Sequence, residues 1–141
     1  MRRPSARLPI GQALGLETFQ NFGVYQPNVD NNYRGPDICM ARPEHISERG
    51  IEGKASLVIE ILSPEDESYD KMPFYAKCGI GEMWIIDPAT RAHEVYVLRG
   101  KTYCAIAPAA GVTRSPLLDV ELSLADGPKL RVRWASGVAE I

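Results

Sequence analysis

Residues 56–75, SLVIEILSPEDESYDKMPFY, decide the fold of this chain, because they join an apolar strand to the start of a helix. Apolar residues fill 57–62 almost without interruption, which is the pattern of a strand covered on both faces. Glu60 interrupts that pattern. An ionised carboxylate in such a strand costs several kcal/mol unless a cation, a metal ion or strong donors meet it. Glu60 is therefore expected to have a partner.

The helix after this strand has to begin late. Pro73 would break a helix that ran through it, so it is expected in a first turn. We therefore predict a turn over 64–68 and a short helix over about 70–78. Lys71 and Tyr75 are four residues apart and share one face of this helix.

The remainder of the chain predicts mainly strands. Residues 1–16 are expected to form an irregular or weakly helical arm, and 42–54, which include His45, a solvated surface loop. A hairpin is expected between 17–26 and 36–41. Further strand-like segments occupy 55–62, 81–87, 93–98, 102–107, 117–124 and 129–134, the last as an edge or surface strand. This order predicts a single domain over 1–141 of the α/β or α+β class, a strand-rich mixed sheet with a helical crossover after the central strand.

Composition places the chain among soluble globular proteins. It has 141 residues, of which 45% are apolar and 24% charged. The absence of a long apolar run and of a secretory signal predicts a cytoplasmic protein without a membrane partner. A net charge of −2 provides no global field toward nucleic acid. The three widely spaced cysteines, at 39, 78 and 104, are expected to be small buried residues without chemical activity.

Three polar residues beside the apolar strands could carry chemistry: Asp37, Glu60 and Lys71. If the strands of the two acids are neighbours, the carboxylates lie about 5 Å apart on one side of the sheet. A hard cation such as Mg²⁺ relieves their repulsion, and a lysine nearby can position a water or meet negative charge. These parts suit metal-assisted hydrolysis of a phosphodiester. The alternative is an ion pair between Glu60 and Lys71 that only fixes the helix.

Short motifs follow one another in a fixed order along residues 33–99, around half of the chain. They are Pro36-Asp37, Leu57 to Pro64, Asp66-Glu67, Lys71, Phe74-Tyr75-Ala76, Gly79-Ile80, Glu82 and Trp84 to Pro88. This series resembles the Uma-two family of restriction-endonuclease-like proteins, within the PD-(D/E)XK nuclease superfamily. The resemblance implies a restriction-endonuclease-like fold and a Mg²⁺-dependent endonuclease that acts on DNA, with Mn²⁺ as a possible substitute.

The resemblance also assigns roles to residues. Asp37 corresponds to the aspartate of the Pro-Asp motif and Glu60 to the second metal-binding acid, with the carbonyl of Ile61 as a third oxygen. The superfamily often has a lysine at the position that Leu62 occupies here. As in the Uma-two family, Lys71 on the following helix takes its place. The implied catalytic residues are Asp37, Glu60 and Lys71, and the implied metal ligands are Asp37, Glu60 and Ile61.

Two further expectations follow from the family pattern. Glu82, Trp84 and Asp87 match positions that we interpret as structural, in strand packing and turn capping. Family members usually begin with a longer segment, a helix that carries an acid completing the site and a histidine near its start. The only early acids here are Glu17 and Asp30, in a predicted strand and a predicted turn. The chain therefore resembles a member shortened at its N-terminus.

Two classes of function remain open at this stage. The first is a metal-dependent DNA endonuclease. The second is an inactive protein of nuclease fold that serves as a binding or assembly module through its sheet edge. A homodimer is expected in either case, because nucleases that cut both strands commonly pair two sites and an exposed sheet edge dimerises easily.

Overall fold

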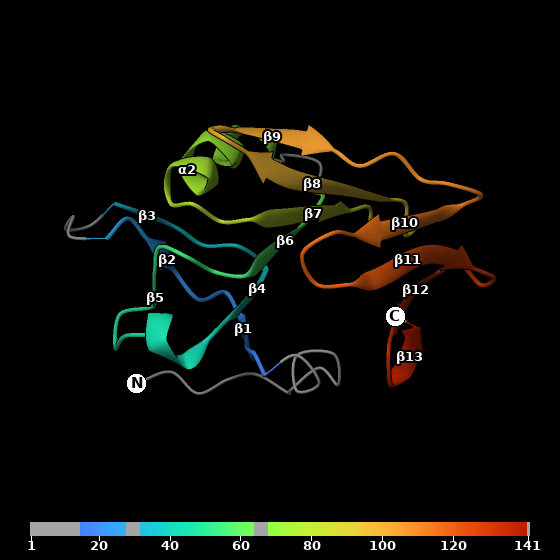
Figure 1. Ribbon diagram of the computed structural model, residues 1–141, viewed down its shortest axis with the longest axis horizontal. Coiled ribbons are helices and arrows are strands. Elements are labelled where there is room, and N and C mark those ends of the chain that lie inside the picture. Colours follow the sequence, from blue (N-terminus) through green and yellow to red (C-terminus); the bar gives the residue numbers. More distant parts are fainter. Residues whose placement is uncertain (1–14, 28–31, 64–67, 141) are drawn as a thin grey trace.

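The computed structural model describes residues 15–27, 32–63 and 68–140, and these form three sheets and one short α-helix (Figure 1). The central sheet has six strands in the order β1-β4-β6-β7-β8-β9: Glu17–Gln20, Ile38–Ala41, Leu57–Ile61, Glu82–Ile86, His93–Arg99 and Thr102–Ala105. A four-stranded sheet contains β10 to β13: Val112–Ser115, Val120–Ala125, Lys129–Trp134 and Gly137–Glu140. A small sheet has the order β3-β2-β5: Tyr33–Arg34, Val24–Tyr25 and Ile51–Glu52.

The predicted central strand, β6, lies inside the central sheet. It pairs antiparallel with β4 and parallel with β7. Parallel neighbours need a crossover connection, and the described part of it contains the 3₁₀ turn η2, Tyr69–Lys71, and the helix α2, Met72–Lys77. Pro73 lies in the first turn of α2, as predicted, and Gly79 follows the helix with φ of +78°. The mixed sheet with a helical crossover confirms the predicted fold class.

Both faces of β6 are covered. On one face Val58 belongs to an apolar cluster that includes Phe74 and Tyr75 of α2. On the other face Leu57 and Ile59 belong to a second cluster, which includes strands β11 and β12 of the four-stranded sheet. Since side chains alternate along a strand, Glu60 faces α2 together with Val58. In Figure 1 the helix and the four-stranded sheet accordingly lie on different sides of the central strands.

The predicted hairpin between 17–26 and 36–41 is confirmed only in its first half. β1 pairs antiparallel with β4, with Glu17 opposite Ala41. The strand is then interrupted at Asn21, whose φ is +52°, and the chain continues as β2 into the small sheet. The predicted surface loop over 42–54 contains the 3₁₀ turn η1, Pro43–His45, and the fully buried strand residue Ile51.

Two predictions for the C-terminal part of the chain need correction. Residues 129–134 form an inner strand, because β13 pairs along the far side of β12. Cys39 and Cys78 are buried as predicted, but Cys104 is exposed, because β9 is the outer strand of the central sheet. Burial raises the pKa of the Cys39 thiol to about 12 and so keeps it protonated.

Some predictions fall outside the described residues. The arm over 1–16 is described only at 15–16, and the turn over 64–68 only at Ser68, which is buried. None of the helices in the described ranges has the length and apolarity to cross a membrane.

Candidate active site

The pairing of β4 with β6 brings the two predicted acids together. Ile38 lies opposite Ile59, so Asp37 and Glu60 are lateral neighbours at the end of the two strands. Asp37 is half-buried, and its Oδ2 accepts a hydrogen bond of 2.7 Å from the backbone N–H of Ile61. This bond ties the Asp37 side chain to the end of β6, directly beside Glu60.

Glu60 is enclosed by two donors from the crossover. Its side chain is 2% exposed. Tyr75 donates its hydroxyl to Oε1 at 2.7 Å, and the Lys71 ammonium lies 3.1 Å from Oε1 and 3.3 Å from Oε2. Glu60 therefore has the partner that the sequence demanded, a lysine together with a tyrosine, and the four-residue spacing of these two residues places them on one helical face.

Opposing effects act on the proton affinity of Glu60. Burial raises the pKa of this carboxyl, while the Tyr75 hydroxyl and the Lys71 charge lower it, and the neighbouring Asp37 charge adds to the rise. The effect of burial is the largest, so the pKa of Glu60 is raised from its ordinary value of 4.5. Further positive charge beside Glu60 would therefore stabilise its ionised form.

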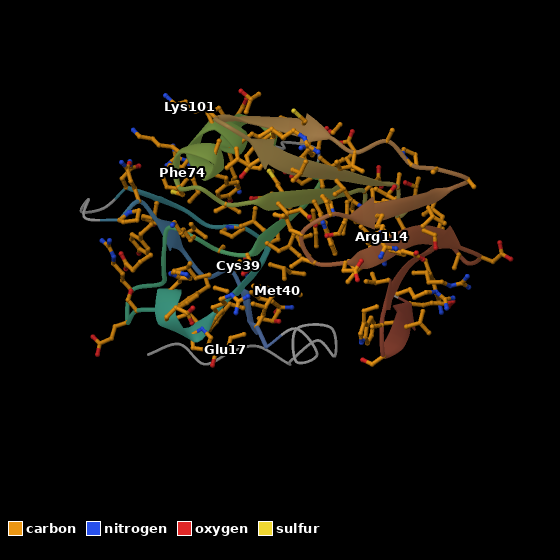
Figure 2. All side chains as sticks on the ribbon, viewed as in Figure 1. Glu17, Cys39, Met40, Phe74, Lys101 and Arg114 are labelled. Carbon is orange, nitrogen blue, oxygen red and sulfur yellow. The ribbon has the colours of Figure 1, made fainter. Side chains whose placement is uncertain are left out.

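Lys71 also reaches the backbone of the segment before β4. Its ammonium donates to the carbonyl of Gly35 at 3.3 Å. Its side chain is 22% exposed, so the ammonium lies between the buried Glu60 and solvent. One residue before Gly35, the guanidinium of Arg34 lies 4.8 Å from the ring centre of Phe74 (labelled in Figure 2) and so connects β3 to α2.

The oxygens at this strand end fit a hard divalent cation. Asp37 and Glu60 supply two carboxylates, and the preference of Mg²⁺ for one or two carboxylates plus substrate oxygens and waters suits them. The N–H of Ile61 points toward β4, and the N–H and C=O of a strand residue point to the same side, so its carbonyl also faces the β4 edge of β6. The described residues contain no group of three or more His, Cys, Asp or Glu side chains that could hold a metal. The site is therefore a two-carboxylate one in this part of the chain.

The residues interpreted as structural have structural contacts. Glu82 is fully buried at the other end of β7, where it accepts hydrogen bonds from the Trp84 indole at 2.6 Å and the Ser115 hydroxyl at 2.5 Å. Asp87 caps a turn by accepting from the backbone N–H groups of Ala89 and Thr90. Neither acid contacts Glu60 or Asp37, in agreement with strand packing and turn capping.

Sequence reasoning missed two contributors to the candidate active site, the Tyr75 hydroxyl and the Gly35 carbonyl, and one partner of Glu82, the Ser115 hydroxyl. The Tyr75 hydroxyl could have been found from its spacing to Lys71, since both side chains share a helical face. The Gly35 carbonyl and the Ser115 hydroxyl carry no signal of their own, because each acts through a contact across 33 or more positions of sequence.

The geometry places this protein in the class of strand-rich α+β folds that carry a carboxylate pair and a lysine at one strand end. The family model of Uma2, described as "Putative restriction endonuclease", matches residues 6–132, and the chain belongs to this family. The resemblance seen in the sequence is thereby confirmed, and the family supports a nuclease. A search of the curated proteins gave no match.

A solved structure shows the same fold. It is a crystal structure from Anabaena variabilis ATCC 29413, titled a "putative nuclease belonging to DUF820". The similarity has a TM-score of 0.56 at 18% sequence identity, and covers 78% of this chain and 67% of the other. At this identity the likeness establishes the shared fold.

Proposed function

We propose that this protein is a divalent-metal-dependent DNA endonuclease of the PD-(D/E)XK type, which hydrolyses phosphodiester bonds with Asp37, Glu60 and Lys71. The observation that carries the proposal is the lateral pairing of Asp37 and Glu60, with the Lys71 ammonium within 3.3 Å of both Glu60 oxygens. Membership of the Uma2 family supports the same reaction class.

Each residue has a defined part in such a reaction. Asp37, Glu60 and the carbonyl of Ile61 would hold Mg²⁺, or Mn²⁺ in its place, and the bound ion supplies an activated water and neutralises phosphate charge. Lys71 places a cation at the solvent side of Glu60, where it meets negative charge that develops on the phosphate. Tyr75 holds the Glu60 carboxylate in one orientation through the bond to Oε1.

One observation favours the second candidate function, an inactive nuclease-fold protein that acts as a binding module. Both Glu60 oxygens already have protein partners, since Lys71 contacts each of them and Tyr75 contacts Oε1. A buried carboxylate with such partners fixes a helix to a strand without any metal. The two functions therefore differ in whether a cation can enter beside Lys71.

Plasmid cleavage in the presence of Mg²⁺ or Mn²⁺ tests the proposal, with titration calorimetry of the metal alongside. Glu60→Gln is expected to lose at least 100-fold in cleavage rate, on the order of what one group in direct contact with the reacting phosphate contributes. Glu82→Gln is the matched control, because Glu82 is equally buried but lies at the other end of its strand. Absence of both cleavage and metal heat in the folded wild-type protein would support the inactive module instead.

A homodimer is the assembly that we propose for cutting both strands of a duplex. β9, Thr102–Ala105, is an outer strand of the central sheet and three of its four residues are exposed, so its edge can pair with a second copy. Light scattering coupled to gel filtration should give twice the mass of 15.6 kDa. A monomer at every concentration tested would contradict this assembly.

A further inference from the structure

A cavity of about 340 Å³ lies at the end of the central strands away from Asp37 and Glu60. Arg42, directly after β4, and Lys54, shortly before β6, line it together with His45 of η1. Leu117 and Leu118, from the turn between β10 and β11, also line it. The segment 42–54 thus contributes three basic side chains to one hollow, and a segment distant in sequence contributes two leucines.

The basic side chains of this cavity have no ion-pair partner within the described part of the chain. No Asp or Glu is among its described lining residues, although Glu17 and Glu44 are neighbours in sequence of lining residues. The side chains of Arg42, His45 and Lys54 make no ion pair or hydrogen bond to a described residue. Arg49, Arg114 and Arg131 elsewhere on the surface are each paired with an acid. A cluster of cations around a hollow without an acid favours an anion.

The walls and the volume narrow the kind of anion. Leucine side chains and Ala55 provide apolar surface beside the cations, and Ser56 adds a hydroxyl. Pockets for small ligands begin at about 300 Å³ and combine apolar walls with a few polar groups. We propose that this cavity binds a phosphate monoester carried on an apolar or aromatic group, of the size of a nucleoside monophosphate. Arg42 and Lys54 contact the phosphate, and the leucine wall contacts the remainder.

The cavity is separate from the candidate active site. Arg42 follows Asp37 by five residues of extended chain, which corresponds to about 17 Å. Glu60 faces α2, whereas Leu118 belongs to the cluster on the other face of the sheet. The phosphate bound here is therefore a different one from the phosphate that would be hydrolysed, and its binding does not depend on the proposed nuclease reaction.

Titration calorimetry of the full chain with adenosine monophosphate tests the site. The double variant Arg42→Gln/Lys54→Gln is expected to weaken binding at least tenfold, since two charge-assisted contacts are lost. Arg133→Gln/Lys101→Gln is the matched control, with the same change in net charge at two exposed residues outside the cavity lining. In Figure 2, Lys101 lies far from Glu17, the neighbour of the lining residue Leu16. The control is expected to bind as the wild type does.

Further titrations identify the phosphate and its source. Adenosine without phosphate should bind at least tenfold more weakly, and inorganic phosphate should compete. A short oligonucleotide is then compared with and without a 5′-phosphate. Tighter binding of the 5′-phosphate form assigns the site to strand ends, and equal binding of the two forms assigns it to free nucleotides. Equal affinity of the double variant and the control would overturn the proposal. Loss of binding in Glu60→Gln would also overturn it, because the nucleotide would then lie at the candidate active site.

Discussion

Tyr75→Phe removes one hydroxyl from the centre of the candidate active site and leaves the ring in place. The Tyr75 side chain is fully buried, and its hydroxyl lies 2.7 Å from Oε1 of a Glu60 that is 2% exposed. Burial and the Glu60 charge raise the pKa of Tyr75 well above its ordinary value, so the hydroxyl stays protonated and acts as a donor. A hydrogen bond to a charged group contributes about 1.5–3 kcal/mol. We expect the free energy of unfolding to fall by about 2 kcal/mol at pH 8.

The loss should depend on pH in a defined direction. The pKa of Glu60 is raised in the folded protein above 4.5, so the folded state holds this proton more tightly than the unfolded state does. The contribution of Glu60 to stability is therefore fully present below pH 4.5 and declines as the pH rises through the folded pKa. Removing the Tyr75 donor raises that pKa further. The variant should consequently lose more stability at pH 8 than at pH 4.5.

Urea unfolding of wild type and variant at these two pH values measures the difference in their free energies of unfolding. The effects of unrelated titrating groups are the same in both proteins and cancel in this difference. Tyr103→Phe is the matched control, because the Tyr103 hydroxyl donates to a neutral acceptor, the carbonyl of Ile80, at 2.6 Å. The control should cost about 1 kcal/mol at both pH values. An equal loss for Tyr75→Phe at pH 4.5 and pH 8 would refute the assignment of a charged acceptor.

Three further predictions concern the neighbours of Glu60 and the far end of β7. Lys71→Met should abolish plasmid cleavage and lower the free energy of unfolding by about 3 kcal/mol at pH 8, because it leaves the buried Glu60 charge without its lysine. Lys77→Met, at an exposed residue, is the control and should change the free energy of unfolding by less than about 0.5 kcal/mol. Asp37→Asn should weaken Mn²⁺ binding by at least about tenfold in calorimetry while the amide oxygen still accepts from Ile61; unchanged binding would remove Asp37 from the metal site. Ser115→Ala should lower the free energy of unfolding by about 2 kcal/mol, because the hydrogen bond to Glu82 is lost, and should leave the cleavage rate per folded molecule unchanged. A reduced cleavage rate would show that Glu82 influences the candidate active site.

The acids and the lysine were predictable because each has a local sign in the sequence. Glu60 interrupts an apolar strand, Asp37 follows a proline, which is excluded from the middle of a central strand, and Lys71 directly precedes the helix after β6. β4 and β6 are neighbours in the central sheet although η1 and β5 separate them in sequence, so their antiparallel pairing and the crossover that follows are enough to bring the three residues together.

The parts that were missed depend on pairing that leaves little trace in the sequence. Strands β2, β3 and β5 have two residues each, which is too short for any alternation to show. β13, Gly137–Glu140, mixes a glycine and an acid with two small apolar residues and acquires its strand conformation from β12. The basic cavity was missed for the same reason: Arg42 and Lys54 lie in a segment that looked like a solvated loop, and Leu117 reaches them only through packing of the second sheet.

The ion pair between Lys71 and Glu60 and the proposed nuclease depend on the same residues. Tyr75 and Lys71 both contact Oε1 of Glu60, whereas among the described residues Oε2 is contacted by the Lys71 ammonium alone, at 3.3 Å. If the proposed cation binds, Asp37 and Glu60 would hold it, and Oε2 of Glu60 would give up its contact with Lys71. Lys71 is partly exposed, so its ammonium can turn toward solvent, where a phosphate would arrive. In the proposed nuclease, the lysine that pairs with Glu60 would be the group that meets the substrate, while Tyr75 would keep the carboxylate in place.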